Sequence, residues 1–258
     1  MSYSDIREAI IKVICFETPT GKRTMLRPIS AHYPAGTLFY RVRKIPIDDT
    51  NLPLKSMSKE SDCWEPPSHI VDVGRLNKKG EALLYTSPIN PTVAFDEMKI
   101  NDDELFSLII YEATEQINVT VIGATPPLED FSKENQLKLR MIQDFLRHEF
   151  IRDVGIGTEF LYQISESIAK NWFDLPPVLH DAWCYPSIAN KGAYNVCFKP
   201  EEKQKLNLRG VQIGSITRDH GYNFDLRFTA KKSDQNETLI YYAPTSEESI
   251  SSFPNVIS

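Results

Sequence analysis

Residues 74–97 carry the clearest structural signals in the chain. They begin with Gly74-Arg-Leu-Asn-Lys-Lys-Gly80 and continue with Glu81-Ala-Leu-Leu-Tyr-Thr-Ser-Pro-Ile-Asn90. They end with Pro91-Thr-Val-Ala-Phe-Asp-Glu97. Glycines at both ends of the first segment favour a turn. Residues 82–86 form a short apolar run that is typical of a buried strand. Asn90 before Pro91 indicates a helix start, because Asn caps a first turn and Pro fits its first position. The stretch therefore predicts a turn, a strand and a short helix that carries Glu97.

The same signals predict elements on both sides of this stretch. An apolar stripe at helical spacing favours a core-packing helix near the N-terminus, with Ser4 in the cap position. Residues 17–36 carry prolines and glycines and are expected to form an irregular lead-in. β-branched and aromatic content predicts a strand pair at 105–113 and 117–123. Further strands are expected at 37–43, 182–185 and 194–198, helices at 134–149 and 158–172, and a β-meander at 206–217, 222–230 and 238–242.

The composition is that of an ordinary soluble globular protein. The chain has 258 residues, of which 41 % are hydrophobic and 25 % are charged. Its 29 basic and 35 acidic residues give a net charge of −6. The chain lacks a dense Lys/Arg block, so nucleic-acid binding is not expected. A few arginines in a cleft can still bind an anionic substrate.

Targeting, membrane and metal signals are weak throughout the sequence. The N-terminus opens with polar and acidic residues, so no signal peptide is expected. No apolar run reaches membrane-spanning length. The 4 cysteines are widely spaced, which is typical of a reduced cytoplasmic protein. The 5 histidines do not follow zinc-ligand spacing, so no metal is expected.

Several polar residues in the middle of the sequence suit a site that binds a phosphorylated compound and stabilises a cation. They are Arg41, Arg75, Tyr85, Glu97 and Ser187. Taken alone, each has a simpler structural explanation. Arg41 and Glu97 fit ordinary surface charges, Arg75 and Ser187 fit turns, and Tyr85 fits a core position with one hydrogen bond. It is the combination of the residues that indicates a site.

The phrases around these residues resemble, in wording and order, the motifs of the RES family, which is named for its Arg, Glu and Ser. The phrases are Leu38-Phe-Tyr-Arg41, Gly74-Arg-Leu-Asn77, Leu84-Tyr-Thr-Ser87, Val93-Ala-Phe-Asp-Glu97 and Tyr185-Pro-Ser187. The resemblance covers roughly residues 36–200 and is strongest over residues 74–97. Leu76 departs from the aromatic or bulky residue of many members, and residues 129–150 lengthen the gap before Ser187.

The resemblance implies a fold. RES proteins are similar in fold to ADP-ribosyltransferase toxins, so we expect an α+β protein with a split mixed β-sheet core and flanking helices. The expected segments are a lead-in with one helix at 1–35, a RES-like catalytic domain at 36–200 and a β-rich extension at 201–258 that packs on the same domain. Capping of the sheet is the first expectation for this extension, and a partner or oligomer interface is the alternative.

The resemblance also implies an activity. RES proteins consume NAD, and the expected reaction is phosphorolysis of the nicotinamide–ribose bond to nicotinamide and ADP-ribose 1″-phosphate. Inorganic phosphate is then the co-substrate, and water is an adjacent acceptor. A mono-ADP-ribosyltransferase acting on a protein is the first alternative. A catalytically silent module that binds a nucleotide or a partner is the second.

The chemistry of NAD assigns roles to the residues. Nicotinamide leaves as a neutral molecule, so a second carboxylic acid, which ordinary glycosidases need to protonate the leaving group, is not required. Glu97 is expected to stabilise the oxocarbenium-like centre or to hold the ribose hydroxyls next to it. Arg41 and Arg75 suit the pyrophosphate, because a guanidinium makes paired hydrogen bonds to phosphate oxygens. If inorganic phosphate is the acceptor, one of the two arginines is expected to position it instead. Tyr85 is expected to stack on nicotinamide or to cap the ribose.

The remaining expectations concern the end of the site and its partners. Ser187 and the nearby Asn195 are expected to hydrogen-bond a ribose or a phosphate. The resemblance to the RES family also implies that the protein is a toxin and that a small antitoxin protein covers its cleft. A homo-oligomer is a further possible assembly of this chain.

Overall fold

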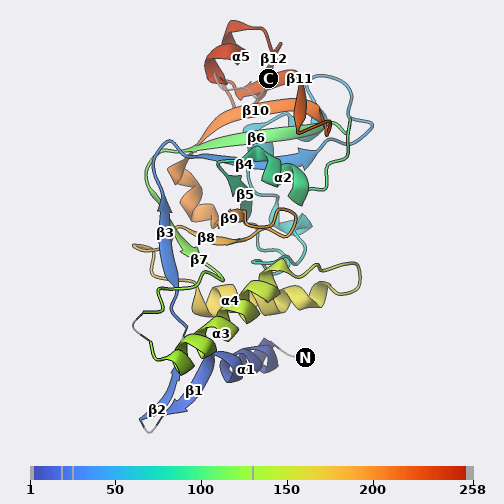
Figure 1. Cartoon of the computed structure of the whole chain (residues 1–258). Coiled ribbons are helices and arrows are strands. Elements are labelled where there is room, and N and C mark those ends of the chain that lie inside the picture. Colours follow the sequence, from blue (N-terminus) through green and yellow to red (C-terminus); the bar gives the residue numbers. More distant parts are fainter. Residues whose placement is uncertain (1–2, 19, 25, 130, 254–258) are drawn as a thin grey trace. The chain divides into compact units, whose positions relative to one another are not determined.

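The computed structural model describes residues 3–18, 20–24, 26–129 and 131–253 (Figure 1). The chain forms two packed units, and each unit is assembled from separate stretches of sequence. The first unit consists of residues 1–33, 67–83 and 117–199, and the second of residues 34–66, 84–116 and 200–258. These units are defined by packing, so the division into functional segments at residues 35 and 200 stays a prediction.

The second unit contains a sheet in the strand order β12-β11-β10-β6-β4-β5. Its strands are β4 (Leu38–Lys44), β5 (Leu84–Pro88), β6 (Phe106–Ala113), β10 (Leu206–Thr217), β11 (Asn223–Lys232) and β12 (Leu239–Tyr242). Neighbouring strands in this unit pair antiparallel. The strands β10, β11 and β12 form the β-meander that the sequence predicts.

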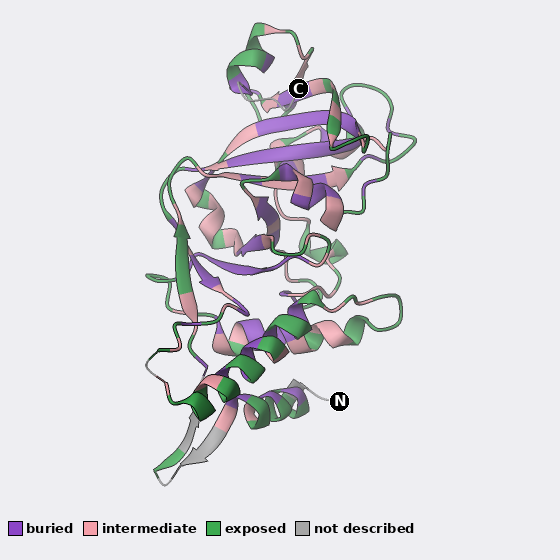
Figure 2. Cartoon of the chain, in the orientation of Figure 1, coloured by how far each residue is buried: buried purple, intermediate pink, exposed green. Residues whose placement is uncertain are grey.

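The middle of this sheet is buried, as Figure 2 shows for β6 and β10. Strand β6 is buried along nearly its whole length, which fits a strand with a neighbour on each side and cover on both faces. On one face a cluster of apolar side chains joins Val42, Phe106 and Leu108 to Phe95 and Phe253. Full burial of each such side chain contributes about 1.5–3 kcal/mol.

Helices of the second unit are short. Helix α2 (Pro91–Glu97) starts as the sequence predicts, since the Asn90 side chain accepts a hydrogen bond of 3.0 Å from the Thr92 N–H. Helix α5 (Glu247–Ser252) follows the meander. The 3₁₀ turns of this unit are η1 (Lys55–Met57), η2 (Glu60–Cys63) and η5 (Pro200–Lys205).

The first unit contains strands in the order β9-β8-β7-β3. They are β3 (Ile29–Tyr33), β7 (Ile117–Val121), β8 (Ala182–Pro186) and β9 (Tyr194–Phe198). Strands β7 and β8 pair parallel, whereas β3 with β7 and β8 with β9 pair antiparallel. A separate antiparallel hairpin joins β1 (Cys15–Thr18) to β2 (Gly21–Thr24).

Helices cover the first unit. Helices α1 (Tyr3–Ile14) and α3 (Lys133–Ile151) both lie against α4 (Tyr162–Trp172), and α3 also touches β8 (Figure 1). Buried Ile6, Ile10 and Ile14 repeat at helical spacing along α1 and confirm the predicted stripe at these positions, whereas Val13, expected in the same stripe, is exposed. The shorter turns are η3 (Ser68–Ile70) and η4 (Glu159–Leu161).

Two expectations differ from the structure. Strands β6 and β7 form where the sequence predicts them, but they do not pair: β6 lies between β4 and β10, and β7 lies between β3 and β8. Residues 17–36, expected to be irregular, contain the end of β1 together with β2 and β3. Pro28 and Pro34 fall just outside β3, where a missing N–H disrupts no ladder.

The α+β class, with a mixed sheet and flanking helices, is confirmed. Likeness to ADP-ribosyltransferases in particular stays a proposal. Among the helices of the described residues, none combines the length and apolar character that crossing a membrane requires.

Candidate functional site

The predicted side chains are divided between the two units. The second unit holds Arg41, Tyr85 and Glu97. The first unit holds Arg75, Ser187 and Asn195. The geometry of each group is described within its own unit.

Arg41 lies on β4, where it is half-buried and in register with Ile109 of β6. Its guanidinium Nη1 donates a hydrogen bond to the carbonyl oxygen of Trp64. The Trp64 ring packs against the ring of Tyr111, with 5.1 Å between centroids. This hydrogen bond therefore holds the end of the long loop 45–66 against the sheet.

Arg43 was not among the predicted residues, yet it shares the environment of Arg41. Alternation along β4 puts both side chains on one face. The Arg43 Nη1 donates to the Asp62 carbonyl oxygen at 2.5 Å. Burial, with the Arg41 charge as a further cause, lowers the pKa of Arg43. The sequence signal was the spacing Arg-x-Arg in a predicted strand, which places two guanidinium groups side by side.

Tyr85 lies on the opposite face of this sheet from Arg41. Ser87 of β5 is in register with Tyr40 of β4, and Tyr85 precedes Ser87 by two residues, so it points to the face of Tyr40. The same face carries Val42, which packs in the cluster with α2. The structure thus places Tyr85 on the α2 side of the sheet and Arg41 on the loop side.

Glu97 is the last residue of α2 and is half-buried. The helix packs on β4 and β5, so Glu97 and Tyr85 belong to the same side of the unit. The neighbouring carboxylate of Asp96 accepts a hydrogen bond from the Tyr222 hydroxyl. Burial and this hydrogen bond raise the pKa of Tyr222, which keeps the phenol neutral. Asp96 therefore has a structural role that distinguishes it from Glu97.

Arg75 of the first unit lies in a bend closed by a 3.0 Å hydrogen bond from the Gly74 N–H to the Asn77 carbonyl. Its guanidinium carbon is 5.5 Å from the centroid of the Tyr162 ring, and Nη2 donates to the Arg152 carbonyl at 3.3 Å. The Nε atom is buried and has no hydrogen-bond partner among the described residues. An unsatisfied buried N–H on a cation favours an anionic ligand.

Ser187 and Asn195 are brought together by the hairpin of β8 and β9. Asn195 is in register with Tyr185, two residues before Ser187. Both side chains are buried. The Ser187 Oγ accepts a hydrogen bond of 3.0 Å from the Asn190 N–H, so it also stabilises the turn, as its structural explanation requires.

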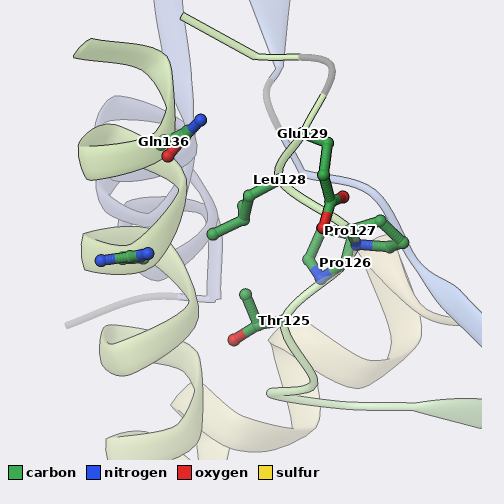
Figure 3. A pocket seen from close by; sticks show the side chains of 7 residues that line it. Thr125, Pro126, Pro127, Leu128, Glu129 and Gln136 are labelled. Atoms are coloured by element: carbon green, nitrogen blue, oxygen red, sulfur yellow. The ribbon is translucent and has the colours of Figure 1, made fainter. Parts of the chain in front are cut away.

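The first unit has a separate hollow of about 580 Å³. Figure 3 shows Leu128 reaching from the preceding loop toward α3 above Thr125. Glu129, Gln136 and Arg140 add polar groups to its lining. None of the predicted site residues lines this hollow.

Comparison with known proteins adds no assignment, since neither a family model nor a curated protein sequence matches the chain. The resemblance to the RES family therefore depends on the motifs. Among the described residues, no group of His, Cys, Asp or Glu side chains could hold a metal ion. The functional groups of the predicted residues are the Glu97 carboxylate, the Tyr85 ring and the guanidinium groups of Arg41 and Arg75, which are suited to phosphate.

Proposed function

We propose that the protein is an enzyme of RES type that cleaves the nicotinamide–ribose bond of NAD, with inorganic phosphate as the acceptor. The observation that carries the proposal is the placement of Glu97 and Tyr85 on one side of the second unit, within the motif order quoted above. A carboxylate and an aromatic residue on the same side of a sheet suit a reacting centre that becomes a cation.

The reaction requires one bond to break and one to form. The bond between the ribose anomeric carbon and the pyridinium nitrogen breaks, and its electron pair leaves with nicotinamide, which becomes neutral. A phosphate oxygen then bonds to the anomeric carbon and gives ADP-ribose 1″-phosphate. Glu97 stabilises the positive charge that develops on the ribose, so it acts mainly in the transition state.

The proposal also gives a role to the guanidinium groups: Arg41 or Arg75 binds the pyrophosphate of NAD or positions the incoming phosphate. Arg41 lies on the face of its sheet opposite to Tyr85, so its position does not itself support a shared centre with Glu97. The unsatisfied Nε of Arg75 is the structural feature that favours this role in the first unit. Ser187 and Asn195 contribute hydrogen bonds from the end of the β8–β9 hairpin.

The biological extension of this proposal is a toxin that depletes NAD in the cytoplasm and that a small antitoxin neutralises. The extension rests on the resemblance alone. The ADP-ribosyltransferase-like arrangement of the sheet belongs to the same proposal.

The decisive experiment compares Glu97→Gln with its matched neighbour Asp96→Asn. The purified proteins are incubated with NAD, with and without inorganic phosphate, and nicotinamide and phosphorus products are followed by NMR. Glu97→Gln should lower kcat by about 100-fold or more with NAD affinity within about threefold, because a transition-state interaction is lost. Asp96→Asn removes the same charge one residue away and should keep turnover.

Other outcomes assign the alternatives. Full turnover by folded Glu97→Gln would reject the role of the carboxylate. Nicotinamide release without phosphate indicates hydrolysis, or self-modification if the intact mass rises by one ADP-ribose. Measurable NAD binding with no product over long incubation favours the silent binding module.

A further inference from the structure

Helix α3 of the first unit carries two stripes of side chains with opposite surroundings. Its inner side packs through side chains that are buried, namely Leu139, Ile142, Leu146 and Phe150. On its outer side Leu137 and Met141 are 60 % and 63 % exposed, and Figure 2 shows exposed residues along this side of the helix. We call the residues of α3 that lie within about 60° of Met141 around the helix axis the outer stripe, which runs from Glu134 to His148.

A hollow of about 330 Å³ borders the outer stripe. Its wall is mostly apolar and includes Val13 of α1 together with Met141 and Phe145 of α3. Val13 is 47 % exposed, although it belongs to the apolar stripe of α1. Exposed apolar side chains around an apolar hollow are typical of a surface that another protein helix covers.

The sequence of the outer stripe indicates which helix this is. Read in both directions from Met141, the stripe is complementary to itself. Its residues match at equal distances on the two sides, Lys138 with Asp144, Leu137 with Phe145, and Glu134 with His148. In an antiparallel pair of identical helices related by a two-fold axis, residues at equal distances from the axis face each other. The stripe therefore fits a second copy of itself.

We propose that the protein forms a symmetric homodimer in which α3 lies antiparallel to α3 of a second copy, with the two-fold axis at Met141. Lys138 of each copy faces Asp144 of the other copy. Leu137 of each copy faces Phe145 of the other, and because Phe145 lines the hollow, Leu137 is the side chain that enters it. Every contact away from the axis occurs twice by symmetry. This surface lies in the first unit and does not depend on NAD cleavage.

Other arrangements of the same stripe are less favourable. A parallel pair sets each charged residue against its own copy, so like charges meet. An antiparallel pair centred one turn earlier, on Leu137, brings the apolar Met141 opposite Lys133. A pair centred one turn later, on Phe145, brings Met141 opposite Glu149, which is buried in its own unit. The register centred on Met141 matches apolar with apolar side chains and opposite charges with each other.

The ion pairs of α3 are compatible with this contact. Lys138 Nζ lies 2.6 Å from the Glu134 carboxylate, and the Lys138 side chain is 50 % exposed. Asp144 has no ion-pair partner among the residues that the structure describes, and the dimer supplies one. The contact between residues 134 and 148 is about 21 Å long. A helix pair of this length is a small interface, so we expect a dissociation constant that is roughly micromolar.

The test measures the mass of the full chain by sedimentation equilibrium at concentrations from about 1 to about 200 μM. The monomer has a mass of 29.5 kDa, and twice this mass should dominate at the highest concentration. Met141→Glu places two carboxylates at the symmetry axis and should weaken the dimer at least about 100-fold, because like charges meet in the contact. Val178→Glu adds the same charge at another exposed apolar residue of the first unit and should dimerise like the parent.

Two charge reversals test the register itself. Lys138→Asp and Asp144→Lys each create two repulsive contacts in a homodimer, so each should weaken it about tenfold or more. An equimolar mixture of these two variants should restore dimers near the parental affinity, since each copy offers the charge that the other now needs. Both positions are exposed, so the substitutions should leave the fold intact.

A single species of 29.5 kDa over the whole concentration range overturns the inference. A dimer that Met141→Glu leaves unchanged does so as well, because its interface would then lie elsewhere. A mixture of the two charge-reversed variants that associates no more tightly than either variant alone rejects the antiparallel register. If circular dichroism shows that Met141→Glu does not fold, the mixture still decides the question.

Discussion

At the scale of single residues, His180 shows how burial sets a protonation state. Its side chain is fully buried in the first unit. Nδ1 is 2.7 Å from the Thr120 hydroxyl oxygen, and Nε2 is 3.5 Å from a carboxylate oxygen of Asp174. Burial, with the Lys199 charge as a further cause, lowers the pKa of His180 to about 4. The imidazole is therefore neutral near pH 7 in the folded protein.

This pKa predicts a loss of stability in acid. The unfolded chain takes up a proton at His180 below its ordinary pKa of 6.5, whereas the folded chain does so only near pH 4. Protons therefore favour the unfolded state through this window, and the free energy of unfolding falls as pH drops from about 6.5 to about 4. The full effect is about 3 kcal/mol. Urea unfolding at pH 7.0, 5.5 and 4.5, followed by circular dichroism, measures it.

Two variants isolate this residue from the carboxylates that also titrate in acid. His180→Gln cannot take up the proton, so its free energy of unfolding should fall less steeply with pH than that of the parent. His69→Gln changes an exposed histidine and serves as the matched control for the substitution itself. Parallel pH dependences in His180→Gln and the parent would show that His180 is not the source.

The sequence predicts a single-residue feature correctly where that feature depends only on neighbouring residues in the chain. The Asn90 cap depends on the next two residues, and it forms as expected. Strand alternation along β4 predicts that Arg41 and Arg43 lie on one face. The partner of Arg41 was not predictable, because the Trp64 carbonyl arrives from a loop more than twenty residues away. The catalytic and binding roles of the predicted site residues stay predictions.

At the scale of elements, β10 depends on a glycine at an irregularity. The register between β10 and β6 shifts between Leu208 and Gly210. Gly210 has φ of +140°, and a Cβ there would lie 2.6 Å from the Ala230 carbonyl oxygen and 2.8 Å from the Phe253 ring. Both the backbone conformation and the space therefore require glycine.

Gly210→Ala should accordingly destabilise the second unit by about 2–4 kcal/mol, since it combines backbone strain with a backbone clash. A thermal melt should show a midpoint at least about 5 °C lower than that of the parent. Gly155→Ala is the control, because a Cβ at Gly155 meets nothing within 4 Å. Equal midpoints for Gly210→Ala and Gly155→Ala would mean that β10 accommodates the methyl group.

Element positions were predictable to a large extent, whereas strand partners were not. Residues 105–113 and 117–123 form strands because their β-branched and aromatic side chains fit a buried sheet. The predicted pairing of these two strands with each other is wrong. The nearly unbroken burial of β6 instead suits a strand between two neighbours, and those neighbours, β4 and β10, come from distant parts of the chain.

At the scale of the whole molecule, the chain returns to the second unit after it completes the first. Strand β10, near the C-terminus, pairs with β6 over residues 206–214 and with β11 on its other side. Ile216 and Phe253 belong to the same buried cluster as Val42 of β4. The region after Pro200 thus supplies part of the core of this unit. It is more than a cap on a finished sheet.

A chain that ends at Pro200 should therefore fail to fold its second unit. It would lose the apolar side chains Leu206, Val211, Ile213, Ile216, Leu239 and Phe253, which are buried in the full protein. At about 1.5–3 kcal/mol each, their burial is comparable to the whole stability of a typical domain. Strand β6 would also become an exposed apolar edge that favours aggregation. Hydrogen exchange followed by mass spectrometry tests this, with slow exchange of residues 106–113 expected in the full chain and rapid exchange in the fragment. A soluble fragment in which residues 106–113 stay as protected as in the full chain would show instead that β4, β5 and β6 hold together without β10.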